Sequence, residues 1–355
     1  MNNFCYIHIP FCSSKCSYCR FASFWNLDEL KINIYIKYLL KEIQKTETGF
    51  NELKSVYFWW WTPAILKIEQ LEKILNKLRE KYWFDRSIEI NIEATPITIT
   101  KSNLIWWKNL WINRVSIWIQ TLNNKSLIEI WRWNKWDIIK ALDNIKEVWF
   151  DNVSIDFIIW LPYIKKWEIK KDMEYILNNY NFIKHISVYM LEEYYYPWKW
   201  KNISISFDEY LVEYINIKEY LKIRWFNRYE ISNFAISWYE CKHNKSYWDH
   251  SSILAFWLWS HWFKNWVRYN NSEQFNKYYL WEQIIDDKLK KSDYFMEKIM
   301  FWLRTTWLTN NLYKKLNIEK IDKFIIDWFL IKKSDKIILS DKGIVVMDYI
   351  LKEII

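Results

Sequence analysis

Residues 6–21 of the chain read YIHIPFCSSKCSYCRF and place three cysteines, Cys12, Cys16 and Cys19, directly after a short apolar run. Three thiolates this close together can hold one metal centre. A structural zinc site takes four ligands and a cubane cluster has four irons to ligate, yet no fourth cysteine lies nearby. One coordination position is therefore open. From the residues alone, two alternatives stay open: a zinc site that includes His8, and three unconnected thiols.

The composition is abnormal in two residue types, because the 355 residues include 28 Trp and only 2 Gly. Glycine makes up about 7% of ordinary chains, and Trp and Gly together reach about that level here. Tryptophans also stand where a turning backbone requires glycine, at residues 59–61, at Trp149 and at Trp160. We therefore hypothesise that most tryptophans are glycines, encoded by UGA codons that some bacterial lineages read as glycine. A genuinely Trp-rich protein is the alternative.

Charge and cysteine content narrow the class of protein. The formal net charge of +9 is spread along the chain without a basic block, which suits small anionic ligands and predicts no nucleic-acid partner. The 5 cysteines, an odd number and mostly clustered, indicate a reducing compartment and a metal site. Because the chain shows no signal segment and no apolar run of about 18 residues, we expect a cytoplasmic protein without a membrane span.

Short apolar runs alternate with amphipathic segments in the first half of the chain. Strands are expected at 4–9, 55–58, 87–92, 114–119, 152–159 and 185–191. Helices are expected between them, at 27–45, 68–81, 101–109, 136–148 and 168–180. Repeated strand–helix units predict an α/β fold with a parallel sheet, curled into a partial (β/α)6 TIM-type barrel. Functional groups of such a barrel lie at the carboxyl ends of its strands, and the cysteine stretch follows the first strand.

The last part of the chain follows another pattern. Helices are expected at 294–304, 318–329 and 341–354, and a hairpin is expected from strands at 330–333 and 336–339. This order predicts a C-terminal α+β, winged-helix-like domain, for which a lid or docking role is preferred because no basic cluster marks a recognition helix. We expect a barrel at 1–225, a ligand-associated segment at 226–270 and the C-terminal domain at 271–355.

The C-x3-C-x2-C spacing and its YIHIP lead-in resemble the cluster loop of radical S-adenosylmethionine (SAM) proteins. In that family the three cysteines bind a [4Fe-4S] cluster, and the amino and carboxylate groups of SAM chelate the fourth iron. Residues 59–63 resemble the Gly-Gly-Gly-Thr-Pro loop of the family, in which three tryptophans would block the approach of SAM. The resemblance implies that SAM is contacted by Tyr6, Trp60, Trp61, Thr62, Glu93, Gln120, Arg132 and Asp156.

Within the superfamily the chain resembles the branch of the anaerobic coproporphyrinogen III oxidases. The oxidases carry a further cysteine two residues after the last cluster cysteine, where this chain has Phe21. Residues 243–248, HNKSYW, match the His-Asn-x-x-Tyr-Trp motif of the heme chaperones of this branch, the HemW group. This match implies that Trp248 is a true tryptophan and that heme is contacted by His243, Asn244, Tyr247 and Trp248. Cys241 is an alternative iron ligand.

These features together predict a heme chaperone. We expect the chain to bind a [4Fe-4S] cluster, SAM, and heme or a related porphyrin, and to deliver heme to an acceptor protein. The alternative is an oxygen-independent coproporphyrinogen III oxidase, which decarboxylates propionate side chains by a reaction begun with a 5′-deoxyadenosyl radical; Phe21 weighs against it. A zinc-dependent nucleic-acid-binding protein is a further alternative.

Overall fold

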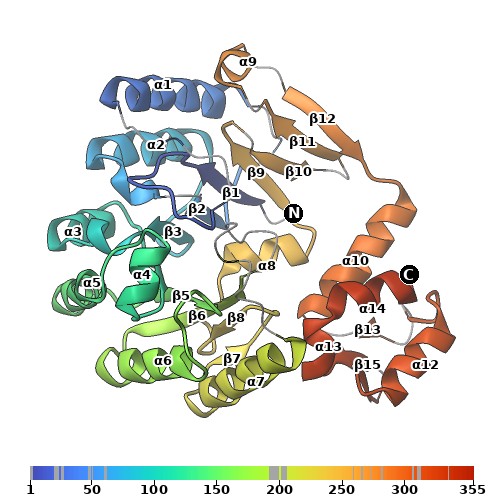
Figure 1. Cartoon of the computed structure of the whole chain (residues 1–355). Helices are drawn as coiled ribbons and strands as arrows, with labels where there is room; N and C mark the ends of the chain where they lie inside the picture. The colour runs from blue at the N-terminus through green and yellow to red at the C-terminus, as the bar shows by residue number, and fades with distance from the viewer. Residues whose placement is uncertain are drawn as a thin grey trace.

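The computed structural model describes residues 3–19, 24, 28–46, 49, 51–59, 62–191, 200, 206–258, 260–264, 267–272, 274–280, 283–305, 308–309, 313–334 and 336–355. A curved sheet runs through the larger part of the molecule, with helices along its outside (Figure 1). Its centre consists of parallel strands in chain order, as the sequence predicts: β1 (Asn3–His8), β2 (Ser55–Trp59), β3 (Glu89–Ala94), β4 (Arg114–Gln120), β5 (Val153–Ile159) and β6 (Ile183–Met190).

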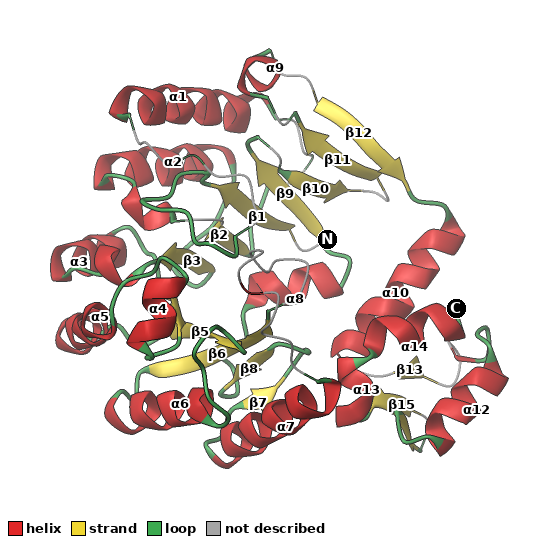
Figure 2. Ribbon diagram, viewed as in Figure 1, coloured by secondary structure: helices red, strands yellow, loops and turns green. Residues whose placement is uncertain are grey.

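The helices that follow these strands in the chain cover the outer face of the sheet (Figure 2). They are α1 (Glu29–Lys45), α2 (Ile68–Lys81), α3 (Lys101–Asn109), α4 (Asn124–Glu129), α5 (Lys135–Val148), α6 (Glu168–Asn179) and α7 (Phe207–Ile223), with short 3-10 turns at Pro63–Ile65 and Pro96–Thr98. Polar side chains accept hydrogen bonds from the first backbone amides of several helices, as Asp28 does in α1 and Asn134 in α5. Such caps satisfy amides that have no partner within the helix, so they fix where each helix begins.

Strands outside the predicted set extend the sheet at both edges. β9 (Ser252–Phe256) pairs parallel with β1, and antiparallel strands follow it outward: β10 (His261–Lys264), β11 (Val267–Asn271) and β12 (Gln283–Lys288). The helix α9 (Phe275–Tyr279) lies between β11 and β12 in the chain. At the other edge, β8 (Asn233–Ala235) pairs with β6 and β7 (Asn227–Arg228) pairs with β8. The proposed domain limits stay a prediction, and the limit at 270/271 falls inside β11.

The C-terminal part forms a separate small sheet with helices, of the kind that the sequence predicts. Helix α10 (Lys291–Thr305) leads into it, and its elements are β13 (Leu308–Thr309), α12 (Ile318–Ile326), β14 (Leu330–Lys333), β15 (Lys336–Leu339), α13 (Asp341–Val345) and α14 (Met347–Ile354). The expectation of one helix over 341–354 is wrong, because the helix is divided at Val346. The β-branched run Ile344–Val346 has low helix propensity, which favours this break.

Side chains alternate between the two faces of the parallel strands. The outer positions are apolar and pack beneath the helices, as Val56, Phe58, Ile90, Ile92, Val115, Ile117, Ile155 and Phe157 do. The inner positions are mostly polar although most are buried: Ser55, Glu89, Asn91, Glu93, Arg114, Ser116, Ser154, Asp156, His185 and Ser187. Burying polar groups costs free energy unless they are hydrogen-bonded, so this inner face marks the part of the fold where function resides.

The backbone bears directly on the hypothesis that most tryptophans are glycines. In the described residues, 13 non-glycine residues have positive φ, and 9 of them are tryptophans, from φ 57° at Trp149 to φ 109° at Trp257. A side chain in this left-handed region costs about 1 kcal/mol, and glycine adopts it freely. Tryptophan is 28 of the 355 residues, so its share among these positions far exceeds its share of the chain. This concentration is what the recoding hypothesis predicts.

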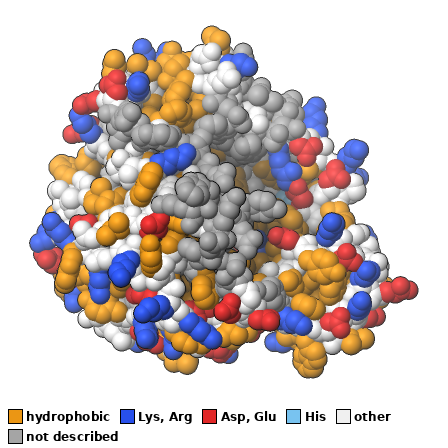
Figure 3. Space-filling model, in the orientation of Figure 1, with side chains coloured by type: hydrophobic (Ala, Val, Ile, Leu, Met, Phe, Trp, Pro, Cys, Tyr) orange, Lys and Arg blue, Asp and Glu red, His pale blue; other side chains and the backbone are white. Residues whose placement is uncertain are grey.

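The surface carries charges of both signs. On the face shown in Figure 3, Lys and Arg side chains are interspersed with Asp and Glu, and no large patch of one sign is visible among the described residues. Among the helices that the structure describes, none combines the length and the apolar character needed to cross a bilayer.

Candidate functional site

The cysteine loop follows β1 and is held against two neighbouring loops. The backbone N–H of Cys12 donates to Phe24 O at 3.2 Å, and that of Thr62 donates to Phe11 O at 3.2 Å. The Sγ atom of Cys12 lies 3.5 Å from Thr62 Oγ1. Cys12 and Cys16 are buried and Cys19 is partly exposed. The three predicted ligands therefore lie in one loop at the carboxyl end of β1.

Arg132, which the sequence predicts as a SAM contact, lies beside this loop. The C-terminal end of α4 is tied to the loop, since Ser17 donates to Ile130 O through its N–H and to Glu129 O through its hydroxyl, both at 3.3 Å. Nη2 of Arg132 donates to Tyr18 OH at 3.2 Å, while Nε and Nη1 are buried without a hydrogen-bond partner among the described residues. Burial raises the pKa of the Cys16 thiol, and the charge of Arg132 offsets part of that rise. The unpartnered atoms favour an anionic ligand here.

A polar cavity of about 210 Å³ lies inside the barrel. Glu93 and Asp156 line it, and so does Trp59. Oε1 of Glu93 accepts from Tyr57 OH at 3.3 Å. Burial raises the pKa of Asp156 to about 7, although a hydrogen bond with Ser187 opposes the shift. Two of the carboxylates that the sequence predicts as SAM contacts are thus brought to one cavity.

Among the other predicted SAM contacts that the structure describes, Gln120 is the most unusual. It ends β4 at a bulge, has φ 70°, is buried, and its Oε1 has no partner in the part of the chain that the structure describes. Strained backbone of this kind persists mainly at functional sites. Tyr6 is buried in β1 and packs near Trp59 and Tyr247. Trp60 and Trp61 lie outside the described residues, as does Phe21.

The four motif residues His243, Asn244, Tyr247 and Trp248 line the far end of the same cavity. They belong to the short helix α8 (Lys242–Trp248). This helix lies inside the arc of strands (Figure 1), near the amino ends of β2 and β3. The motif therefore lies at the amino end of the barrel, whereas the cysteine loop follows the carboxyl end of β1.

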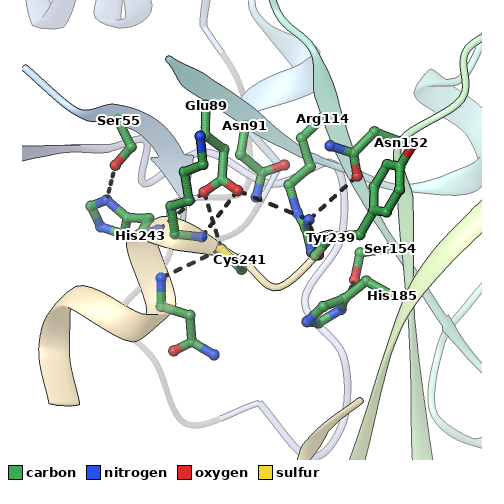
Figure 4. A network of polar contacts seen from close by, with 12 residues as sticks. Ser55, Glu89, Asn91, Arg114, Asn152, Ser154, His185, Tyr239, Cys241 and His243 are labelled. Atoms are coloured by element: carbon green, nitrogen blue, oxygen red, sulfur yellow. Dashed lines mark hydrogen bonds and ion pairs between the residues drawn. The ribbon is translucent and has the colours of Figure 1, made fainter. Parts of the chain in front are cut away.

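A buried polar network around α8 was not predicted from the sequence (Figure 4). Glu89 accepts backbone hydrogen bonds from the start of α8, and Arg114 donates to Asn152 Oδ1 at 3.3 Å and to Tyr239 O at 2.9 Å. His185 bonds Ser154 Oγ at 2.7 Å and Tyr229 OH at 2.8 Å. The sequence does contain a signal for this network. Glu89 and Arg114 are the first residues of strands whose alternate positions are apolar, and a charged residue at the start of such a strand indicates a polar inner face.

Three comparisons place the chain among known proteins. Residues 6–176 match the radical SAM superfamily. The heme chaperone HemW of Buchnera aphidicola subsp. Schizaphis graminum is 29% identical, over 98% of this chain and 96% of its own length. HemW of Buchnera aphidicola subsp. Acyrthosiphon pisum is 31% identical, over 72% of this chain and 69% of its own length.

The chain belongs to the HemW family of radical SAM proteins. Its fold agrees with that of HemN, the coproporphyrinogen III oxidase of Escherichia coli, described as a radical SAM enzyme. The TM-score is 0.81 at 17% identity, over 99% of this chain and 89% of that chain. At this identity the likeness concerns the fold alone.

The cysteine loop suits a HemW-type cluster better than a single zinc ion. Within the residues described above, no three His, Cys, Asp or Glu side chains converge on a point where one metal ion could bind. His8, the fourth ligand of the zinc alternative, has its Nδ1 at 2.6 Å from Tyr6 OH and its ring stacked on Trp257. In a cubane cluster each thiolate ligates a different iron, so convergence on one point is not required. With the unpartnered Nε and Nη1 atoms of Arg132 beside them, these residues fit a cluster and its anionic ligand.

The surroundings of His243 do not fit heme, although the HemW motif suggests it. His243 is 1% exposed, and its ring stacks on Tyr57 with 5.0 Å between ring centroids. The cavity beside it, of about 210 Å³, is smaller than the roughly 300 Å³ at which small-molecule sites usually begin. His243 Nε2 is buried without a partner among the described residues, and the cavity that His243 lines is too small in this arrangement to hold a porphyrin.

Proposed function

We propose that this chain is a HemW-type heme chaperone that binds a [4Fe-4S] cluster and SAM and delivers heme to an acceptor protein. The observation that carries the proposal is similarity to HemW over 98% of this chain, joined to a cysteine loop beside which Nε and Nη1 of Arg132 are buried without a hydrogen-bond partner among the described residues. We further propose a reducing, cytoplasmic compartment, because all five cysteines are free.

In this proposal Cys12, Cys16 and Cys19 hold the cluster. When bound, the cluster supplies an iron with an open coordination position for the amino and carboxylate groups of SAM, and an electron for its reduction. Arg132 binds and orients the carboxylate with its unpartnered Nε and Nη1 atoms. Thr62, next to Cys12, and Gln120, at the end of β4, bind polar groups at the same edge of the barrel.

The carboxylates inside the barrel, Glu93 and Asp156, have a different role from Arg132. Glu93 and Asp156 accept hydrogen bonds from the polar part of the bound molecule that extends into the barrel, and Tyr6 limits the space on the β1 side. Trp60 and Trp61 stand where the family has backbone contacts to SAM, a role that requires glycine. Trp59 lines the cavity and reduces its volume, so the proposal includes glycine at these positions.

The test separates the chaperone from the oxidase. The chain with glycine at residues 59–61 is reconstituted with iron and sulfide, reduced, and supplied with SAM and coproporphyrinogen III under anaerobic conditions. We expect no protoporphyrinogen, because Phe21 stands where the oxidases have a cysteine, and we expect a Soret band when hemin is added. Sustained turnover of coproporphyrinogen III would overturn the chaperone assignment, and so would failure to bind hemin.

A further inference from the structure

The motif helix α8 is attached to the amino end of the barrel by a buried carboxylate. Oε1 of Glu89 accepts from the backbone N–H of His243 at 3.0 Å, and Oε2 accepts from that of Lys242 at 3.1 Å. The Cys241 thiol, just before α8, lies 3.4 Å from Oε1. A carboxylate at a helix start satisfies amides that have no partner within the helix and complements the helix dipole. Glu89 thus fixes the start of α8 to the start of β3.

The charge of Glu89 is balanced inside the protein. Nη1 of Arg114 lies 4.0 Å from Oε2 of Glu89, and both side chains are buried. Removing one partner of such a buried pair leaves an uncompensated charge and is strongly destabilising. Figure 4 shows Glu89 between α8 on one side and Arg114 on the other. Glu89, which attaches α8, therefore belongs to the buried polar network inside the barrel.

His243 supplies a second attachment through its side chain. Its Nδ1 lies 2.9 Å from Ser55 Oγ, at the start of β2. Its ring stacks on Tyr57 and meets Phe4 and Tyr247 edge-on. Burial lowers the pKa of His243 to about 3, so the ring is neutral at physiological pH. One ring nitrogen is thus used for a contact between α8 and the barrel, while one aromatic ring stacks on the imidazole and two others meet it in edge-to-face geometry.

The far end of α8 contacts the C-terminal part of the chain. The guanidinium of Arg304, on α10, lies 4.6 Å from the ring of Trp248, and its Nε is 3.2 Å from Oε2 of the buried Glu230. The rings of Trp248 and Phe301, also on α10, lie 5.4 Å apart. Helix α8 therefore joins the interior of the barrel to the helix that leads into the C-terminal sheet.

We propose that α8 is a plug that closes the amino end of the barrel, and that His243 is the positioning residue that holds it there through Ser55. In this role the motif shapes the inner wall of the cavity with Asn244, Tyr247 and Trp248, and His243 is not the iron ligand of heme. The polar contacts of α8 with Glu89 and Ser55 support this role, and none of these contacts involves heme.

Two buried cysteines allow a direct test of the plug. Cys241 stands at the start of α8, and Cys5 lies in the middle of β1. Both are buried, so we expect each to react with iodoacetamide mainly after its surroundings open. Peptide mass spectrometry of the folded chain gives the alkylation rate at each cysteine. The ratio of the two rates separates release of α8 from global unfolding.

We expect His243→Ala to raise the alkylation rate at Cys241 about tenfold or more relative to Cys5, because a buried contact is lost. Ser55→Ala, which removes the other partner, should act in the same direction, and the double variant should add little. An equal rise at both cysteines, or no rise at either, would overturn the plug. Should His243→Ala fail to fold, Ser55→Ala still decides the question.

Two conservative variants separate positioning from iron ligation. His243→Asn keeps a polar atom near the Nδ1 position and has none at Nε2, whereas His243→Gln does the reverse. We expect Asn to keep the Cys241 rate within about twofold of the parent, Gln to raise it, and the Soret band with hemin to be the same in the Asn variant and the parent. Loss of the Soret band in the Asn variant with Cys241 still protected would show that His243 is the ligand. If the parent chain bound no hemin, the proposed chaperone function would be refuted. The alkylation rates would still test whether α8 is a plug, because they do not depend on heme.

Discussion

Cys12, Cys16 and Cys19 differ from the other two cysteines in their surroundings. Burial raises the pKa of the Cys5 and Cys241 thiols strongly, and neither lies in the loop after β1. We expect Cys12→Ala, Cys16→Ala or Cys19→Ala each to abolish the brown absorption of the reconstituted cluster, because three ligands leave none to spare. Cys5→Ala and Cys241→Ala are the matched controls and should retain it. Loss of iron in the Cys241 variant as complete as in the Cys16 variant would contradict the assignment.

Glu42 gives the stability of the protein a dependence on pH. Its carboxylate accepts from Asn271 Nδ2 at 2.5 Å and from Tyr278 OH at 2.6 Å, but burial outweighs these bonds and raises its pKa from 4.5 to about 7. The folded protein therefore binds more protons than the unfolded chain between these values. The stabilisation from protonated Glu42 is complete below pH 4.5 and is lost as the pH rises to about 7, by about 3 kcal/mol.

The measurement is chemical unfolding of the parent and of Glu42→Gln at several pH values. Asp156 and Asp172 also have raised pKa values, so the difference between the two proteins isolates Glu42. We expect the variant to be less stable at low pH, because an amide cannot accept both hydrogen bonds, and the difference to shrink as the pH rises. A difference that stays constant from pH 4 to pH 8 would mean that Glu42 does not titrate in this range.

At the scale of single elements, the two exposed tryptophans of α5 offer a matched pair. Trp149 ends the helix with φ 57° and is 84% exposed, whereas Trp136 lies in its first turn and is 73% exposed. We expect Trp149→Gly to raise the free energy of unfolding by about 1 kcal/mol, because glycine relieves the left-handed conformation. Trp136→Gly should lower it by about 0.5 to 1 kcal/mol, because glycine weakens a helix. Denaturant unfolding measures both, and equal effects would remove the physical basis of the recoding hypothesis.

The central strands and their helices were predictable because their pattern is local. In β2 and β3 every second residue is apolar and faces the helices, and α2 was expected at the residues where it occurs, 68–81. The outer strands β10 to β12 were missed, since their sequences show no clear alternation and their pairing depends on β9. The break at Val346 was missed because an apolar periodicity continues across it.

At the scale of the whole molecule, the volume of the cavity limits ligand binding. Trp59 lines the cavity, and residues 60 and 61 follow it in the loop that the family uses for SAM. We expect the chain with glycine at 59–61 to bind SAM after cluster reconstitution, and the chain with tryptophan there to bind none, as measured by isothermal titration calorimetry. A control chain with glycine at the exposed residues Trp83, Trp106 and Trp136 should also bind none. Equal binding of SAM by the two glycine variants would show that the tryptophans at residues 59–61 do not block the SAM site.

The sequence by itself determined the cysteine loop, the order of the parallel strands and the anomalous tryptophans. Each of these three features depends only on residue types and on their spacing along the chain. Folding changes neither the residue types nor the spacing. The prediction that Glu93, Gln120, Arg132 and Asp156 contact SAM comes from their resemblance to family residues in or after the strands, and it stays a prediction. Only the structure shows that two nitrogens of Arg132, beside the cysteines, have no hydrogen-bond partner among the described residues.

The tertiary structure alone decided the position of the HNKSYW motif. The six residues of the motif do not reveal by themselves that α8 packs against the amino ends of β2 and β3, and this packing is the basis of the proposed plug. Ser55, Glu89 and His243 are far apart in the chain and meet because parallel strands bring their amino ends to one edge of the sheet. Contacts over such distances depend on the closure of the whole barrel, which no local pattern encodes.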